Sequence, residues 1–195
     1  GFAVWNEKEQ TLMLARDFFG IKPVYYAEID GHFVFASEIK SILAFPGYER
    51  KVNQKALEQY LSFQYAPLEE TFFKGIYKLM PGHMLLYKNG NYEIKTYFKT
   101  KLTPGKWNRK TNMDQLRSQL AEILRDSVKH HMLSDVEVGA FLSGGVDSGY
   151  LASASGADQA FTVGFDEGDR YSEVNKAAKV AEKAGLKHHV KIISK

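Results

Sequence analysis

Residues 136–148 read Val-Glu-Val-Gly-Ala-Phe-Leu-Ser-Gly-Gly-Val-Asp-Ser, and this stretch is the most informative part of the 195-residue chain. The apolar residues 136–142 predict a strand, and a run of small residues over 148–154 predicts a short helix. The two glycines between them let the backbone come close to an anion, and the helix start presents free N–H groups and the positive end of its dipole. This order of elements predicts a phosphate site.

An ordinary glycine turn between a strand and a helix is the alternative explanation of the same stretch. Five defined positions within six residues are hard to obtain by accident, since average residue usage gives a chance probability on the order of a few in ten thousand. The stretch is not a P-loop, because its glycines are adjacent and no lysine follows them. We therefore expect the hydroxyls of Ser143 and Ser148 to donate to phosphate, and the Asp147 carboxylate to hold Mg²⁺ between phosphates.

The second half of the chain alternates between helical and strand patterns. Apolar residues at helical spacing predict a helix whose start Thr111 and Asp114 mark as an approximate capping box. Strands are expected over 159–165 and 188–193, with a helix over 173–184 between them. This alternation predicts an α/β domain with a parallel sheet, helices on both of its faces, and ligands at the carboxyl ends of its strands. The apolar stripe of the first helix consists of Leu116, Leu120, Ile123, Leu124 and Val128.

The first half of the chain follows a different pattern, with short strands and two helices. Asp30-Gly31 and Asn89-Gly90 each separate two apolar or alternating runs, and both dipeptides predict hairpin turns. Ser37 and Asn53 are expected to cap helices, the second with Leu57, Tyr60 and Leu61 on its inward face. The expected strands cover Phe2–Trp5, Thr11–Ala15, Val24–Glu28, His32–Ala36, His83–Tyr87 and Tyr92–Tyr97.

Composition and charge set the domain plan and exclude several classes of protein. The formal net charge of +3 comes from residues 99–112, which hold five basic and no acidic side chains. Dispersed around Pro104-Gly105, these charges indicate a solvated linker, not a nucleic-acid surface. We expect one domain over 1–98, this linker, and a second domain over 113–195. No run is long and apolar enough for a membrane span, and the absence of cysteine and of a secretory signal predicts a cytoplasmic location.

Two histidine pairs raise the question of a metal site. His130-His131 lies near a helix end, and His188-His189 opens a strand. Adjacent residues point to different sides, and no cysteine or carboxylate cluster accompanies either pair. A cation at a helix C-terminus and a strand-edge residue are the favoured interpretations.

The Ser143–Ser148 stretch resembles the pyrophosphate loop of the ATP pyrophosphatases. Members of that family cleave ATP between the α- and β-phosphates and place AMP on a carboxylate or carbonyl oxygen. The resemblance implies an ATP pyrophosphatase fold for 113–195, with Asp147 as the Mg²⁺ ligand. It also implies adenine contacts from Leu142 and from the backbone of Val163. The ATP-binding residues implied in this way are Leu142, Ser143, Gly144, Gly145, Val146, Asp147, Ser148 and Val163.

The first half resembles the class II glutamine amidotransferases, which have an N-terminal-nucleophile fold of α+β type. The stretches that carry this resemblance are Arg16–Tyr26, Phe35–Ile42 and Pro81–His83. The resemblance implies that Asp17 grips the α-amino group of glutamine, as a carboxylate can grip an ammonium ion. An amidotransferase domain ahead of a pyrophosphate loop is similar to the glutamine-hydrolysing asparagine synthetase family.

That family resemblance implies a reaction and a set of partners. ATP, L-aspartate and L-glutamine would give L-asparagine, L-glutamate, AMP and diphosphate through β-aspartyl-AMP, with small molecules as partners and a homodimer left open. The alternatives are a related ligase such as a β-lactam synthetase, which adenylates another carboxylate, and a non-catalytic binding protein that keeps the fold.

The chain departs from the family at the nucleophile. The family's nucleophile is an N-terminal cysteine, and this chain begins with Gly1 and contains no cysteine. We therefore assign no catalytic residue, and we expect a middle fragment of about one third of a longer enzyme. The isolated fragment is expected to be inactive.

Overall fold

The computed structural model describes residues 1–101, 112–166 and 173–194. The chain divides into two compact units, Gly1–Pro104 and Gly105–Lys195, and each is considered by itself. Most of the predicted linker 99–112 lies outside the described residues. Within the described residues, no helix has the length and apolar character needed to cross a bilayer.

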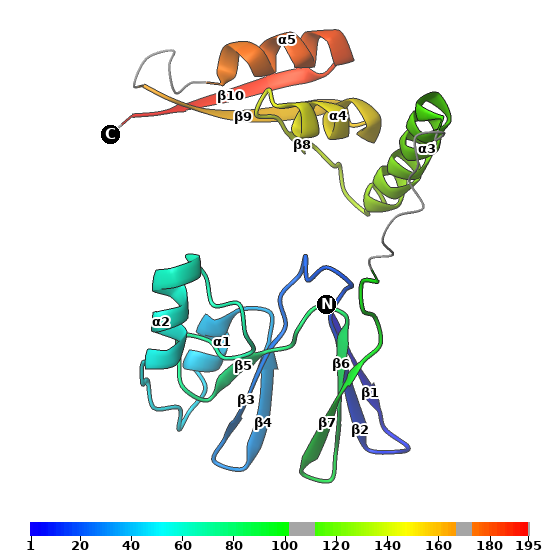
Figure 1. The fold of residues 1–195 in the computed structure, drawn as a ribbon. Helices are drawn as coiled ribbons and strands as arrows, with labels where there is room; N and C mark the ends of the chain where they lie inside the picture. The colour runs from blue at the N-terminus through cyan, green and yellow to red at the C-terminus, as the bar shows by residue number, and fades with distance from the viewer. Residues whose placement is uncertain (102–111, 167–172, 195) are drawn as a thin grey trace. The chain divides into compact units, whose positions relative to one another are not determined.

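Two antiparallel sheets form the first unit (Figure 1). One has the strand order β1-β2-β6-β7 and the other β4-β3-β5. Most of the expected strands and both hairpins are confirmed. Asp30 and Gly31 have φ of 47° and 78°, and Asn89 and Gly90 have φ of 52° and 78°, as tight two-residue hairpin turns require. The strands are β1 (Phe2–Asn6), β2 (Thr11–Ala15), β3 (Tyr25–Ile29), β4 (His32–Ala36), β5 (Ile76–Lys78), β6 (His83–Lys88) and β7 (Asn91–Thr96).

The core of this unit lies between the two sheets. Leu14 and Leu85 from the first sheet and Tyr26 from the second are buried in one cluster. The rings of Phe33 and Tyr87 stack across the same space with centroids 4.6 Å apart. The short helix α1 (Ile39–Leu43) covers the other face of the β4-β3-β5 sheet through a second buried cluster.

The helix caps and the inward face expected in the first unit are wrong in part. The N-cap of α1 is Glu38 and not Ser37, whereas the N-cap of α2 (Gln54–Phe63) is Asn53, as expected. Neither cap residue makes a side-chain hydrogen bond to its helix. The buried residue of α2 is Ala56. The three residues expected to face inward are 41%, 44% and 75% exposed; they are Leu57, Tyr60 and Leu61.

Three parallel strands form the sheet of the second unit, in the order β10-β9-β8. Strand β9 has the expected bounds, but β8 is confined to two residues and not the seven expected over 136–142. Val136 is 76% exposed and pairs with no strand, so apolar character alone did not extend the ladder. The elements are α3 (Met113–His131), β8 (Ala140–Phe141), α4 (Val146–Ser155), β9 (Gln159–Phe165), α5 (Val174–Ala184) and β10 (Lys187–Ile193).

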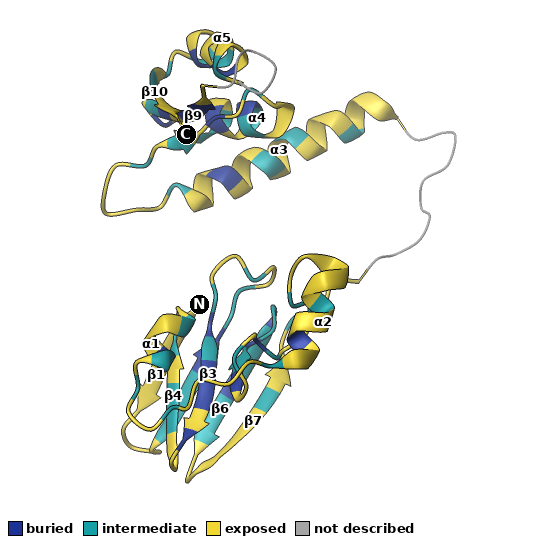
Figure 2. Ribbon diagram, turned by 90° about the vertical axis from the view of Figure 1, so that its left-hand side faces the viewer, coloured by how far each residue is buried: buried dark blue, intermediate teal, exposed yellow. Residues whose placement is uncertain are grey.

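Helices α4 and α5 pack on the same face of this sheet, contrary to the expectation of helices on both faces. Their alanines share a cluster with Ala160 of β9, and β9 alternates between buried and exposed residues along its length. Helix α3, by contrast, is exposed over most of its length (Figure 2). The strands follow one another in a single direction across the sheet. Because each β-α-β crossover is right-handed, both helices then lie on one side.

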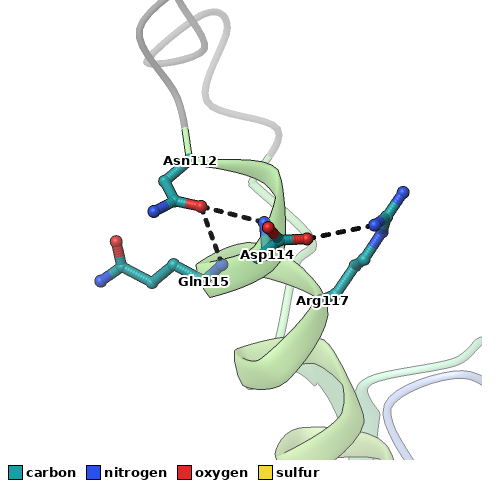
Figure 3. A network of polar contacts seen from close by, with 4 residues as sticks. All are labelled: Asn112, Asp114, Gln115 and Arg117. Carbon is teal, nitrogen blue, oxygen red and sulfur yellow. Dashed lines mark hydrogen bonds and ion pairs between the residues drawn. The ribbon is translucent and has the colours of Figure 1, made fainter.

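The start of α3 differs from the expected capping box. Asn112 is the N-cap, and its side-chain oxygen accepts from the backbone N–H of Asp114 at 3.0 Å and of Gln115 at 3.2 Å (Figure 3). Thr111, the predicted cap, lies outside the described residues. Of the apolar stripe on α3 only Val128 is buried, and Leu120 and Ile123 are exposed.

The Asn112 cap yields a stability prediction. Asn112→Ala removes the acceptor of two N–H groups and should lower the free energy of unfolding by about 0.5–2 kcal/mol, measured by urea denaturation. Asn112→Asp keeps an acceptor at the same place and should stay within a few tenths of a kcal/mol of the wild type. Equal losses in both variants would contradict a capping role.

Candidate functional site

The loop Ser143–Ser148 lies at the carboxyl end of β8 and leads directly into α4, as the sequence predicts. Its two serines are joined: the hydroxyl oxygens of Ser143 and Ser148 are 2.9 Å apart, and the backbone N–H of Ser143 donates to Ser148 Oγ at 3.2 Å. The N–H of Gly145 lies 3.4 Å from Ser143 Oγ, and Ser148 Oγ is 3.3 Å from the Gly145 carbonyl. These bonds close the loop into a compact turn.

Gly144 has no room for a side chain. Its φ is +77°, a conformation that L side chains rarely adopt. A Cβ at this position would lie 2.7 Å from the Cβ of Lys176 and 2.8 Å from the backbone nitrogen of Ala177, both on α5. The sequence predicted a glycine for the approach of an anion, and the structure adds that α5 demands one as well.

The start of α4 can hold an anion. Gly145 is the N-cap and has no side chain, so the first-turn N–H groups of α4 lack a capping acceptor within the helix. The helix dipole adds positive potential at the same place. A backbone without bulk leaves these N–H groups open to an anion, while the hydroxyls of Ser143 and Ser148 are engaged with each other and with the Gly145 carbonyl.

Asp147 is suited to a hard cation near that anion. It lies in the first turn of α4 and is exposed, and it has no ion pair within the described residues. A single free carboxylate beside phosphate oxygens matches the way Mg²⁺ is held at nucleotide sites. The described residues contain no cluster of three His, Cys, Asp or Glu side chains that could hold a metal ion.

The remaining ATP candidates lie on the neighbouring strand and at the end of β8. Leu142 is 2% exposed and packs in the alanine cluster under the helices. Val163 is on β9, and the register of the parallel pair β8–β9 places Phe141 opposite Phe161. The same register continued by two residues places Ser143 beside Val163. The Val163 side chain is on the sheet face that the helices leave open. The structure thus brings Leu142, Val163 and the loop to one edge.

Sequence reasoning missed two side chains that support this edge. Thr162 is 4% exposed, and its hydroxyl donates to the Leu142 carbonyl at 2.6 Å. His188 Nε2 lies 2.7 Å from the same hydroxyl. A threonine at a buried position of a strand was the available signal, since a buried hydroxyl needs partners. The neighbouring His189 stacks on Phe161 from the other face, so the two adjacent histidines do point to different sides.

Asp17 occupies a second candidate site, in the loop between β2 and β3. Its Oδ2 accepts from the N–H of Phe19 at 3.2 Å and of Ile21 at 2.9 Å, and its Oδ1 accepts from the N–H of Lys22 at 3.0 Å. Arg16 holds the same loop from the other side by donating to the carbonyls of Gly20, Lys22 and Leu79 at 2.7–3.0 Å. Asp17 therefore organises its own loop, which the sequence did not reveal.

The charge of Asp17 is favoured by these contacts. Desolvation raises the pKa of this carboxyl, but the three backbone N–H donors oppose it, and the net effect is a pKa below the ordinary value of 3.8. The group is thus ionised at neutral pH. A carboxylate with fixed geometry and full charge is available in this loop.

Comparison with known proteins decides the family. The family described as "Glutamine amidotransferase domain" matches residues 1–98, and the family described as "Asparagine synthase" matches residues 119–195. The chain belongs to the glutamine-hydrolysing asparagine synthetase family. The family resemblance predicted from the sequence is thus confirmed.

Several curated relatives match nearly the whole chain. Glutamine-hydrolyzing asparagine synthetase 1 of Bacillus subtilis (strain 168) is 37% identical over 99% of this chain and 30% of its own length. Asparagine synthetase 2 of the same organism is 38% identical over 83% of this chain and 23% of its own length. Amidase chry2 of Gibberella zeae is 30% identical over 97% of the chain and 30% of its own length. The chain spans about a third or less of these relatives.

The packing of Gly144 yields a prediction with a matched control. Gly156 ends α4 with φ of +68°, and a Cβ added there would meet no atom within 4 Å, whereas Gly144 faces α5 closely. Gly156→Ala should cost about 1–2 kcal/mol of unfolding free energy from the backbone alone. Gly144→Ala should cost a further ~1–3 kcal/mol because α5 must shift. Urea denaturation measures both, and equal costs would show that α5 does not restrict Gly144.

Proposed function

We propose that this chain is part of an enzyme that makes L-asparagine from L-aspartate, with ATP as the source of energy and L-glutamine as the source of nitrogen. L-Glutamate, AMP and diphosphate are the other products. The observation that carries the proposal is the Ser143–Ser148 loop at an uncapped helix start, in a chain that begins with amidotransferase sequence. The similarity to asparagine synthetases of Bacillus subtilis supports the choice of substrate.

The domain plan follows from this proposal. Residues 1–98 would form part of the glutamine amidotransferase domain, of N-terminal-nucleophile type, and residues 113–195 part of an ATP pyrophosphatase domain. The parallel sheet with a phosphate-binding loop at its carboxyl edge supports the second assignment. The 195 residues contain no cysteine, so we assign no nucleophile for glutamine hydrolysis to them.

The chemistry proposed for the second unit is adenylation followed by amide formation. An oxygen of the aspartate β-carboxylate attacks the α-phosphorus of ATP, and diphosphate leaves as β-aspartyl-AMP forms. Ammonia then attacks the β-carbonyl carbon, AMP leaves, and the nitrogen loses a proton to give the amide. First-turn N–H groups of α4 and the hydroxyls of Ser143 and Ser148 would stabilise the departing diphosphate. Magnesium held by Asp147 would neutralise phosphate charge.

Adenine would bind beside the loop. We propose that Leu142 and the backbone of Val163 contact the base, since both lie next to the loop at the carboxyl edge of the sheet. The proposed partners are small molecules and not nucleic acids. We also propose a cytoplasmic location, because a chain without cysteine forms no disulfides. A homodimer stays a prediction. A β-lactam synthetase is the less favoured alternative function. The similarity to an amidase shows that not all similar proteins are named asparagine synthetases.

Asp147 provides the first test, in the full-length protein. Asp147→Asn keeps the size of the side chain but removes its charge, so aspartate-dependent exchange between ATP and diphosphate should fall by tenfold or more, and more Mg²⁺ should be needed for half-maximal rate. Asp158→Asn, which alters an exposed carboxylate just ahead of β9, is the control and should leave exchange unchanged. Exchange at the wild-type rate in Asp147→Asn would remove the metal assignment.

Asp17 provides the second test. Its three N–H bonds leave about one of four lone-pair positions for an ammonium group, and we propose that it holds the α-amino group of glutamine there. Asp17→Ala should weaken glutamine-dependent synthesis by about ten- to a hundredfold, since a charged hydrogen bond is lost, and spare synthesis from free ammonia.

Arg16→Lys separates the two roles of that loop. It weakens three bonds to carbonyls and leaves the Asp17 carboxylate in place. A small effect of Arg16→Lys beside a large effect of Asp17→Ala supports direct contact with glutamine. The same selective loss in both variants would assign Asp17 to loop order alone, as would a well-folded Asp17→Ala that loses both activities equally.

A further inference from the structure

We propose that His188 is a positioning residue for the adenylation site. It would act through Thr162 on the peptide bond between Leu142 and Ser143, the last peptide before the glycines of the loop. This inference rests on the proposed function, and it assigns a role to a side chain from a strand that contributes nothing else to the loop.

The direction of the hydrogen bonds follows from counting donors. The Leu142 carbonyl can only accept, so the single hydroxyl proton of Thr162 is directed to it at 2.6 Å. The Thr162 oxygen can then only accept from His188 Nε2, 2.7 Å away. His188 must therefore carry a proton on Nε2. A directed chain of hydrogen bonds runs from His188 on β10 through Thr162 on β9 to Leu142, the residue that follows β8.

The target of this chain is a peptide that is held on both sides. Its carbonyl belongs to Leu142 and accepts from Thr162, and its N–H belongs to Ser143 and donates to Ser148 Oγ at 3.2 Å. The N–H of Leu142 also donates to the Phe161 carbonyl at 2.9 Å. Rotation of the Leu142–Ser143 peptide would break the contacts on both sides, including the bond from the Ser143 N–H to the Ser148 hydroxyl of the loop. The chain of bonds therefore sets the direction in which loop donors point.

Burial gives this arrangement its strength. Thr162 is 4% exposed and Leu142 is 2% exposed, so water does not readily replace either partner. Thr162 and His188 lie on the face of the sheet that the helices cover, because Ala160 pairs with His188 in the register and shares a face with Thr162. A buried hydroxyl that loses its donor or acceptor is costly, and the peptide would reorient to recover a partner.

Two pairs of variants in the full-length protein test the proposal. Thr162→Val keeps the shape but removes the hydroxyl, and His188→Leu removes the donor; each should lower kcat/KM for ATP in aspartate-dependent exchange by about ten- to a hundredfold. Thr162→Ser keeps the hydroxyl and His188→Gln keeps an N–H donor, so both should recover to within about threefold of the wild type. The KM for aspartate and the rate of glutamine hydrolysis should not change in any of these four variants.

The matched control is His189→Leu, the same change one residue along the strand but on its other face, which should leave exchange near wild type. Thermal unfolding of each variant identifies general loss of fold. Equal activity in Thr162→Val and Thr162→Ser, or in His188→Leu and His188→Gln, would overturn the proposal, because the hydrogen bonds would then have no effect on the reaction.

A spectroscopic measurement separates this inference from the proposed function. Long-range ¹H–¹⁵N spectra of protein with ¹⁵N-labelled histidine report the tautomer of each imidazole, and the His188 signal is the one that disappears in His188→Gln. This signal should show the Nε2–H tautomer in the wild type. In Thr162→Val the Nε2–H tautomer should no longer be favoured. An Nδ1–H tautomer at His188 would overturn the proposal whatever reaction the enzyme catalyses. A wild-type protein with the Nε2–H tautomer but no aspartate-dependent exchange would overturn the proposed function and, with it, the role in adenylation.

Discussion

The site depends on how closely α4 and α5 approach the sheet and each other. Their shared core is built from alanines, with Ala152 on α4, Ala160 on β9, and Ala177 and Ala181 on α5 all nearly inaccessible to solvent. Gly149 adds to this closeness, because a Cβ there would already lie 3.3 Å from Val180. Small side chains thus bring two helix axes near each other, and this packing directs the start of α4 to the carboxyl edge of the sheet.

The same packing explains why the loop contains glycines. Gly144 lies between the turn that ends β8 and the first turns of α5, and neither its backbone angle nor the space around it permits a side chain. The anion-binding function predicted from sequence would also require a bare backbone at this point. The packing demand on Gly144 is thus joined by the demand of the proposed phosphate site, and a substitution there would affect stability and, under that proposal, phosphate binding. The neighbouring Gly145 has more room, with no atom nearer than 3.4 Å to a Cβ.

Local signals in the sequence predicted much of the fold. Asp30-Gly31 and Asn89-Gly90 determine their hairpins, since positive φ at two successive residues is a property of the dipeptide itself. Strands β2, β4 and β9 have the bounds expected from short apolar or alternating runs in the sequence. The loop at residues 143–148 was predicted for a similar reason, because its glycines and its helix start are adjacent in sequence.

Features that depend on distant partners were not predictable in the same way. Val136 is of a residue type that favours strands, but it pairs with no strand of the described residues. Strand β8 is therefore shorter than the apolar run over 136–142. The predicted inward face of α2 was wrong, since Ala56 is buried while three larger apolar residues of the helix are exposed. Asp17 was expected to bind a ligand, and its hydrogen bonds to the backbone of its own loop were not expected. These bonds depend on the conformation of residues 17–22, which no periodic pattern in the sequence predicts. Thr162 and His188 meet only after β9 and β10 pair.

The absence of a lysine after the glycines has a consequence for the chemistry the loop can support. A P-loop lysine places a full positive charge at the β- and γ-phosphates and suits transfer of the terminal phosphoryl group. The donors proposed here are backbone N–H groups and two hydroxyls, which carry only partial charge, so their effect would depend on direction more than on proximity. A loop of this kind needs a rigid support for its peptide planes. The alanine core, the Gly144 contact and the buried hydroxyl of Thr162 supply that rigidity from three different elements.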